Sequence, residues 1–262
     1  MRRPVILLPP SKGKATGGSG RPYARTLSRH PLAAARRELL AAAVASASER
    51  DDAVLARRCG VASSSASDAR RMLEGLADAP TMPAQRRYTG VVHGNAGLAD
   101  LDVADVGAEV LIVSALMGLV ALDEPVPAYR LEFTATLPGL GGIATFWRER
   151  LAEELCRTAG GSRVWDLLPG EHARMWPPGL REDLDVVGVR FVRPDGRAAN
   201  AARTKVAKGL LAAHLVANPR STASAVVRAV DTAVRKGLTG PLGPGWRGAQ
   251  DDDGLVATYV GE

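Results

Sequence analysis

The sequence predicts a mixed α/β fold in which central strands are covered by helices. Short apolar runs that are typical of buried strands alternate with longer stretches in which apolar residues recur every three or four positions. Hydrophobic residues make up 46% of the 262 residues, which is enough for a substantial core. Because neither an internal repeat nor a clear linker interrupts residues 1–262, we expect a single compact domain.

The amino-terminal part begins with a strand and continues into helices. Pro4–Leu8 is an apolar run too short for a signal peptide, so we predict that it is the first buried strand. Pro9–Gly20 is rich in proline, glycine and serine and is predicted to be a loop. The spacing of apolar residues then predicts three helices, over Leu32–Ser48, Asp52–Arg58 and Ser65–Leu76.

The rest of the chain alternates between the two kinds of element. In order, it is predicted to contain the strand Val110–Ser114, the helix Trp147–Thr158, the strands Val164–Leu168 and Val186–Val192, the helices Val206–Val216 and Thr222–Lys236, and the strand Leu255–Val260. This alternation is typical of a sheet with helices packed against it.

Charge is distributed unevenly along the chain. Residues 1–90 hold 16 Lys and Arg against 7 Asp and Glu, a balance of +9, whereas residues 91–200 hold 10 against 16. The net charge of +6 therefore comes mainly from the amino-terminal third. Such asymmetry is typical of proteins that bind polyanions, but solvated arginines on helices produce it as well, and both interpretations stay open.

The sequence also bears on where the protein resides and on whether it binds a metal. No run of about 18 apolar residues occurs, so no membrane span is predicted. Cys59 and Cys156 are far apart and no secretion signal is recognised, which favours reduced thiols in the cytoplasm. No two of the four histidines have metal-ligand spacing, so neither a metal nor a cofactor is predicted.

Five short motifs place a cation or a hydrogen-bonding aromatic residue beside glycine, proline or a strand end, where backbone comes close to ligands. They are Pro9-Pro10-Ser11-Lys12-Gly13-Lys14, Arg87-Tyr88-Thr89-Gly90, Pro127-Ala128-Tyr129-Arg130-Leu131, Phe146-Trp147 and Lys205-Val206-Ala207-Lys208-Gly209. In this order they resemble the YaaA family of bacterial peroxide-stress proteins over nearly the whole chain. The resemblance implies a YaaA-like domain with a basic cleft that binds DNA through its phosphates or its structure.

The loop Pro9–Gly20 is the first candidate ligand site. Ser11, Lys12 and Lys14 offer a hydroxyl and two ammonium groups near backbone N–H groups, which suits a phosphate. A flexible basic surface loop would have the same composition, so the pattern by itself decides nothing. Relatives in the family carry a lysine that we match to Lys14.

Lys205 and Lys208 form the second candidate site. They are three residues apart at the start of a predicted helix and therefore project from one face. Lysines close to the positive end of a helix repel it unless an anion compensates, which fits a phosphate clamp or a lysine with a lowered pKa. Glu171 follows a predicted strand, where α/β sheets place ligand groups, and would be an acid–base partner.

Tyr88, Tyr129 and Arg130 are candidate ligand contacts because their motifs match the family. Arg130 lies between prolines and an apolar Leu131, so its guanidinium is expected to be held in place. It would bind a phosphate in a bidentate manner or form an ion pair with Glu132 or Glu171.

Residues 52–76 are interpreted as a helix-hairpin-helix element within the domain. In such an element, backbone N–H groups of the hairpin contact a DNA phosphate without regard to base sequence. Arg57, Arg58, Arg70 and Arg71 would add salt-sensitive attraction. Two short helices joined by glycine also occur in many proteins that bind no DNA.

This chain departs from the family pattern at several positions. Lys12 stands where relatives usually have an acidic residue, and Arg203 and Thr204 stand where they have an aromatic and a polar residue. Ala121 and Leu122 stand where relatives commonly have arginine and proline, and Pro169 and His172 stand where some have serine and tyrosine. The scaffold is therefore predicted to be kept while part of the cleft lining differs, as in a divergent paralogue of actinobacterial type.

Three functions stay open on this evidence, one of which is a structural or interaction protein with a merely basic surface. Of the other two, the first is binding of DNA or phosphate groups in a basic cleft by Lys14, Arg130, Lys205 and Lys208, in the setting of peroxide stress. The second is a biosynthetic enzyme acting on a phosphorylated or nucleoside-like small molecule, with Lys205 or Lys208 as base or nucleophile. A groove about 20 Å wide would admit a duplex, whereas a closed pocket of about 300–1,000 Å³ suits a small ligand.

Overall fold

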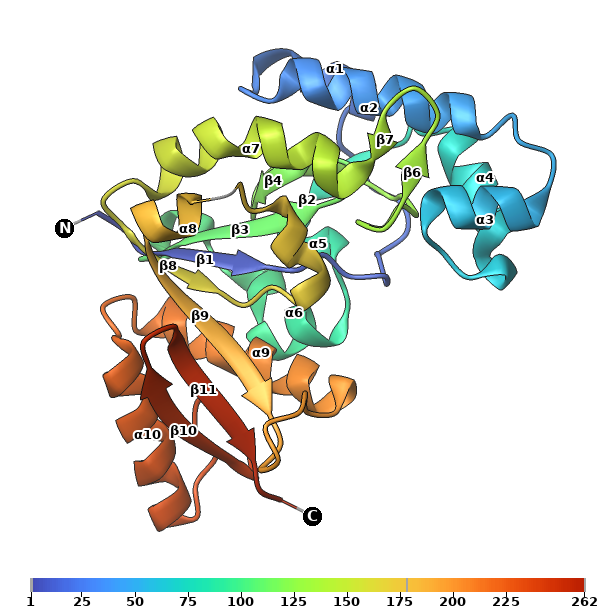
Figure 1. The fold of residues 1–262 in the computed structure, drawn as a ribbon. Helices are drawn as coiled ribbons and strands as arrows, with labels where there is room; N and C mark the ends of the chain where they lie inside the picture. Colours follow the sequence, from blue (N-terminus) through green and yellow to red (C-terminus); the bar gives the residue numbers. More distant parts are fainter. Residues whose placement is uncertain (1, 178, 262) are drawn as a thin grey trace.

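A seven-stranded mixed sheet runs through the centre of the molecule, with helices on both of its faces (Figure 1). The structure is a computed structural model that describes residues 2–177 and 179–261. The strand order is β10-β11-β9-β8-β1-β3-β4. These strands are β1 (Val5–Leu8), β3 (Glu109–Ser114), β4 (Gly118–Ala121), β8 (Arg163–Asp166), β9 (Asp185–Val192), β10 (Trp246–Asp251) and β11 (Gly254–Tyr259).

The five inner strands are parallel to one another, and only the two edge strands, β4 and β10, are antiparallel to their neighbours. Every residue of β1 is fully buried. A parallel strand covered on both faces needs apolar side chains on both, which explains the unbroken Val-Ile-Leu-Leu run. The predicted first strand is thus confirmed as the middle of the core.

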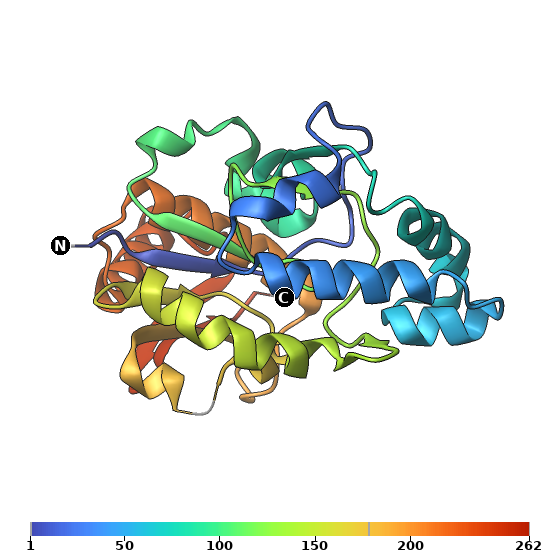
Figure 2. The same cartoon turned by 90° about the horizontal axis from the view of Figure 1, so that it is seen from above.

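Helices α2 and α7 lie across one face of the sheet, and α6 and α9 lie on the other (Figures 1 and 2). The helices are α1 (Tyr23–Thr26), α2 (Ala33–Ser46), α3 (Asp52–Cys59), α4 (Ala66–Glu74), α5 (Ala84–Arg87), α6 (Val91–Ala96), α7 (Ile143–Ala159), α8 (Leu180–Asp183), α9 (Ala201–Ala217) and α10 (Ala223–Lys236). Two small two-stranded sheets pair β2 (Thr81–Pro83) with β5 (Pro125–Pro127), and β6 (Thr136–Leu137) with β7 (Gly141–Gly142).

The predicted mixed α/β class is confirmed, and each predicted strand and helix is present with bounds shifted by a few residues. One shift matters for function: α9 begins at Ala201 rather than at Val206. Asn200 caps it, because its Oδ1 accepts hydrogen bonds from the backbone N–H groups of Ala202 and Arg203. Lys205 and Lys208 therefore lie beyond the first turn, and the predicted repulsion by the helix end was wrong because that field fades within one turn.

The sheet places a topological switch point between β1 and β8. The chain leaves β1 toward β3 on one side, whereas it leaves β8 toward β9 on the other. Ligands of open α/β sheets bind outside the carboxyl ends of the strands at such a point. Among the described residues, no helix has the length and hydropathy to cross a bilayer.

Candidate functional site

A large cavity, here called the cleft, opens at this switch point and has a volume of about 1130 Å³. Two of its walls come from the segments that follow β1 and β8. The first consists of residues 9–13, and the second consists of Asp166 at the end of β8 together with residues 168–172. Residues 90–93 at α6, residues 188–192 of β9 and one side of α9 complete the cleft. The cleft therefore combines segments that are far apart in the sequence and meet only because of the strand order.

Three lysines line the cleft without a carboxylate partner. Its lining contains five cations and three carboxylates. Arg181 is paired with Asp166, and Arg190 is paired with Asp251 outside the cleft. No ion pair within 4 Å involves Lys12, Lys205 or Lys208 in the part of the chain that the structure describes. These three ammonium groups are not neutralised by direct contact with a carboxylate, which leaves room for a bound anion.

Lys208 is the most buried of the three, with 6% of its surface exposed. Burial lowers its pKa to about 8, although Asp166 and Glu171 nearby favour the charged form. Lys205 and Lys12 are exposed at the rim. The cleft thus has one inner ammonium group that titrates close to neutral pH and two outer ones that can attract anions from solvent.

The cleft also concentrates polar atoms that have no hydrogen-bond partner. Among the described residues, eight buried side-chain nitrogen or oxygen atoms lack a partner, and four of them belong to His93, His172 and Thr204 in the cleft. Leaving such an atom unpaired costs about 1–3 kcal/mol, so their clustering makes the cleft the candidate ligand site.

Lys14 lies behind the cleft wall in an aromatic cage. Its Nζ donates to the backbone oxygen of Ser11 at 2.8 Å and lies 4.0 Å from the ring centre of Tyr129. Burial lowers its pKa to about 8. Tyr88 and Tyr129 are themselves buried, and their hydroxyls are 2.9 Å apart. None of the three lines the cleft, so they support the loop that does; direct contact with a ligand stays a prediction.

The donor and the acceptor in each hydroxyl–hydroxyl hydrogen bond of this cage can be assigned. Ser114 Oγ accepts from the backbone N–H groups of Leu116 and Met117, so its own hydrogen is donated to Tyr129 at 2.8 Å. Tyr129 in turn donates to Tyr88. The cage is therefore anchored to the backbone beyond β3.

Two family-matched motifs meet in space beside the cleft. The backbone N–H of Thr89 donates to the oxygen of Gly13 at 3.3 Å, and that of Ala15 donates to the oxygen of Arg87 at 2.9 Å. A Cβ added to Gly90 would come within 2.5 Å of the Ser11 Cβ. Glycine in the Tyr-Thr-Gly motif thus allows the loop after β1 to approach closely, and the predicted loop is tied down.

Arg130 and Glu132 follow Tyr129 of the cage in the chain, and they differ in their relation to the cleft. Arg130 does not line the cleft, and its predicted ion pair with Glu132 or Glu171 is not seen among the described residues. Glu132 does line the cleft, and burial raises its pKa even though Lys12 and Lys14 oppose the shift. Sequence reasoning considered Glu132 only as an ion-pair partner and missed it as a lining residue.

The predicted helices of the 52–76 element are present as α3 and α4, at one end of the molecule (Figure 2). Three of its four arginines form local ion pairs: Arg58 with Glu49, Arg70 with Asp52, and Arg71 with Asp68. Arg57 is exposed. These acidic partners offset much of the positive charge on which the predicted attraction to DNA depends.

The departures from the family pattern at positions 121, 122, 169 and 172 divide between two places. Pro169 and His172 line the cleft, as predicted for a changed lining. Ala121 and Leu122 lie at the end of β4 instead, and Ala121 lines a second cavity of about 320 Å³. Trp147 is fully buried, and its Nε1 donates to the oxygen of Ala115 at 2.8 Å, as expected of a core residue.

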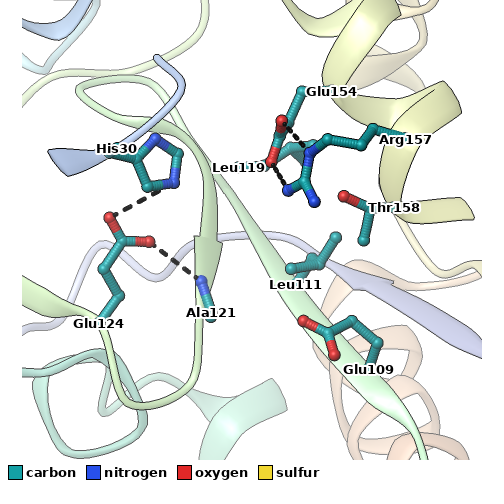
Figure 3. Close-up of a pocket in the computed structure, with 9 residues that line it drawn as sticks. All are labelled: His30, Glu109, Leu111, Leu119, Ala121, Glu124, Glu154, Arg157 and Thr158. Carbon is teal, nitrogen blue, oxygen red and sulfur yellow. Dashed lines mark hydrogen bonds and ion pairs between the residues drawn. The ribbon is translucent and has the colours of Figure 1, made fainter. Parts of the chain in front are cut away.

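Figure 3 shows that polar groups in the second cavity largely pair with one another. Arg157 donates to both carboxylate oxygens of Glu154, at 2.9 and 2.5 Å. Glu124 lies 3.8 Å from His30 and accepts a hydrogen bond from the backbone of Ala121. With most of its charges already satisfied, this cavity has less need of a ligand than the cleft.

Several lining residues escaped sequence reasoning. His93, Asp166 and Arg181 carry no motif of their own, and Thr204 was noted only as a departure from the family pattern. Asp166 alone had a usable signal, since it ends the buried run of β8 at the carboxyl edge of the sheet.

Comparison with known proteins agrees with the motifs. The family model described as "Peroxide stress protein YaaA" matches residues 5–233. A UPF0246 protein of Streptomyces coelicolor is 32% identical over 220 residues, which cover 81% of this chain and 83% of the relative. A UPF0246 protein of Corynebacterium efficiens is 30% identical over 244 residues, covering 92% and 96%. The chain therefore belongs to the YaaA (UPF0246) family, which the description of its model links to peroxide stress.

Proposed function

We propose that the cleft binds a small molecule through an anionic, phosphate-type group and that Lys208 holds this group. The observation that carries the proposal is the set of three cleft lysines without a carboxylate partner, one of them almost fully buried. A lysine acts as a point charge with three donors, which suits phosphate oxygens. Lys12 and Lys205 at the rim attract the anion, and Lys208 receives it inside.

The size of the cleft favours a small molecule over a duplex. Its volume of about 1130 Å³ is close to the range of about 300–1,000 Å³ that is typical of small-ligand pockets. Enzymatic turnover is compatible with the same residues. Lys208, with its pKa near 8, would act as base or nucleophile, and Glu171, exposed at the cleft, as acid–base partner.

DNA binding is the second candidate, favoured by the net charge of +6 and the exposed Arg57. Because the other three arginines of α3 and α4 are paired, we expect any duplex binding to be weak and strongly salt-dependent. A role in peroxide stress is carried over from the family description as part of the proposal. Location in the cytoplasm stays a prediction.

The test compares inorganic phosphate and a short DNA duplex as ligands, by calorimetry, in three proteins. Phosphate is expected to bind the wild type and to bind Lys208→Met about tenfold or more weakly, since a charge-assisted contact is lost. Lys236→Met is the matched control, because Lys236 is exposed at the end of α10 and does not line the cleft.

Methionine keeps much of the apolar stem of lysine, so packing changes little. Equal phosphate affinity in the wild type and Lys208→Met would overturn the proposal. Duplex binding that falls steeply with salt and is indifferent to Lys208→Met would favour the DNA-binding alternative instead.

A further inference from the structure

His172 is a buried histidine whose ring nitrogens both lack a partner. It is 4% exposed, lines the cleft and packs against Phe133 with 4.4 Å between ring centres. Neither Nδ1 nor Nε2 has a hydrogen-bond partner in the described part of the chain, and the nearest Glu171 oxygen is 3.9 Å from Nδ1. Burial, aided by the charge of Lys208, lowers its pKa to about 4. The neutral ring therefore presents one donor and one acceptor.

Thr204 and His93 add two more unpaired polar atoms. Thr204 Oγ1 is buried without a partner, although a threonine in a helix commonly bonds back to the preceding turn. Thr204 is four residues before Lys208 on α9, so the two side chains share a face.

The hydrogen-bonding role of the unpaired His93 nitrogen can be assigned. Nε2 of this ring lies 2.9 Å from the oxygen of Pro9, which only accepts, so Nε2 carries the hydrogen. Burial lowers the pKa of His93 to about 4, so the ring is neutral at pH 7. Its Nδ1 is therefore a bare acceptor.

Together these side chains bring four buried, unpaired polar atoms to the cleft that the three lysines also line. They offer both donors and acceptors, and apolar Phe191, Val189 and Leu168 line the same cleft. A small, wholly polar ligand such as free phosphate uses none of the apolar wall. A flat heterocycle with alternating N–H and C=O groups along its edge would use both the polar atoms and the apolar wall.

We propose that His172, Thr204 and His93 form a second subsite that binds the uncharged, nucleobase-like edge of the molecule whose phosphate is held by Lys208. The inference rests on the proposed function and narrows its ligand class to a phosphorylated heterocycle, such as a nucleoside monophosphate. Specificity arises because a site with unpaired donors and acceptors rejects any ring that leaves them unpaired.

The experiment measures the affinity of inorganic phosphate and of the four ribonucleoside 5′-monophosphates for the wild type, His172→Phe and Thr204→Val. In the wild type, at least one nucleotide is expected to bind about tenfold or more tightly than phosphate, as two added hydrogen bonds would give. Thr204→Val keeps the shape of the side chain and His172→Phe keeps an aromatic ring, while both remove the unpaired atoms, so this advantage should fall about tenfold in them. Phosphate affinity should stay within about twofold, because Lys208 is untouched.

A second readout distinguishes a binding role from a packing role. If these polar groups serve to bind a ligand, they are buried without hydrogen bonds in the ligand-free protein, which costs stability. Removing them should therefore raise the unfolding temperature of both ligand-free variants. Phosphate binding without any nucleotide preference in the wild type would overturn this inference and leave the proposed function intact. A nucleotide preference that survives in both variants would overturn it as well. Absence of phosphate binding in the wild type would overturn both.

Discussion

Replacing Arg87 by methionine is expected to destabilise the protein by about 3 kcal/mol or more, because several carbonyl oxygens would lose a charged donor at once. Arg87 is fully buried and has no carboxylate partner among the described residues. Its guanidinium instead donates to backbone oxygens, at 3.0 Å to Val126, 2.9 Å to Gly17 and 3.0 Å to Pro80, and also to Ala15. It thereby fastens the loop Pro9–Gly20 to β2 and β5.

Chemical denaturation measures this loss, and limited trypsin digestion locates it. Cleavage after Lys12 and Lys14 should accelerate in Arg87→Met, since the loop loses its anchor. Arg86→Met is the matched control: Arg86 is exposed and donates a single 3.5 Å hydrogen bond to Ala99, so a change within about 0.5 kcal/mol is expected. Similar stabilities of the two variants would contradict the role given to Arg87.

Replacing Gly209 by alanine is expected to destabilise the protein by about 2–3 kcal/mol through overpacking of two helices. An added Cβ would lie 2.5 Å from the Val92 oxygen and 2.5 Å from the Asn95 Cβ, so α9 would have to move away from α6. Both helices supply walls of the cleft. The glycine that follows the two lysines in the motif is therefore required by close helix packing.

Gly94→Ala provides a control of opposite sign. Gly94 lies in α6 of the same pair, but a Cβ there would meet no atom within 4 Å. Alanine is favoured over glycine in helices, so this variant should be up to about 1 kcal/mol more stable than the wild type. Urea denaturation measures the stability of Gly209→Ala and Gly94→Ala against the wild type. If both variants, or neither, were destabilised, the described packing of α6 on α9 would be wrong.

The fold could be predicted because its strongest signals are local. Fully buried strands such as Val5–Leu8 and amphipathic helices such as α10 carry their structure in the pattern of apolar residues. The strand β10 was missed because an edge strand, here Trp-Arg-Gly-Ala-Gln-Asp, is half exposed and largely polar. The start of α9 was misplaced because Asn200 was not recognised as its cap.

The site was predictable only where residues belong to motifs. Ser11, Lys12, Glu171, Lys205 and Lys208 were all predicted, and the structure brings all five to the lining of one cleft.

The hydrogen-bonding state of the inner polar residues of the cleft was not predicted. Whether His93 or Thr204 lacks a hydrogen-bond partner depends on the packing of several distant segments, which no local pattern encodes. The same holds for Tyr88 and Tyr129, whose motifs were recognised while their burial around Lys14 was not.

The most direct test of the central claim is the titration of Lys208 itself, with and without an anion. The chain has five lysines, so ¹³C-lysine labelling gives few Cε signals, and Lys208→Arg assigns one of them. The free protein should show Lys208 titrating near pH 8, since burial disfavours its charged form.

Sulfate keeps a constant charge in this range and should raise that pKa, because a bound anion favours the ammonium form. By the same linkage, the affinity for sulfate should fall as the pH rises through 8, because Lys208 loses its charge there. Sulfate should not change the NMR signal of Lys236. A Lys208 that titrates near its ordinary value of 10.5 and ignores sulfate would contradict the account.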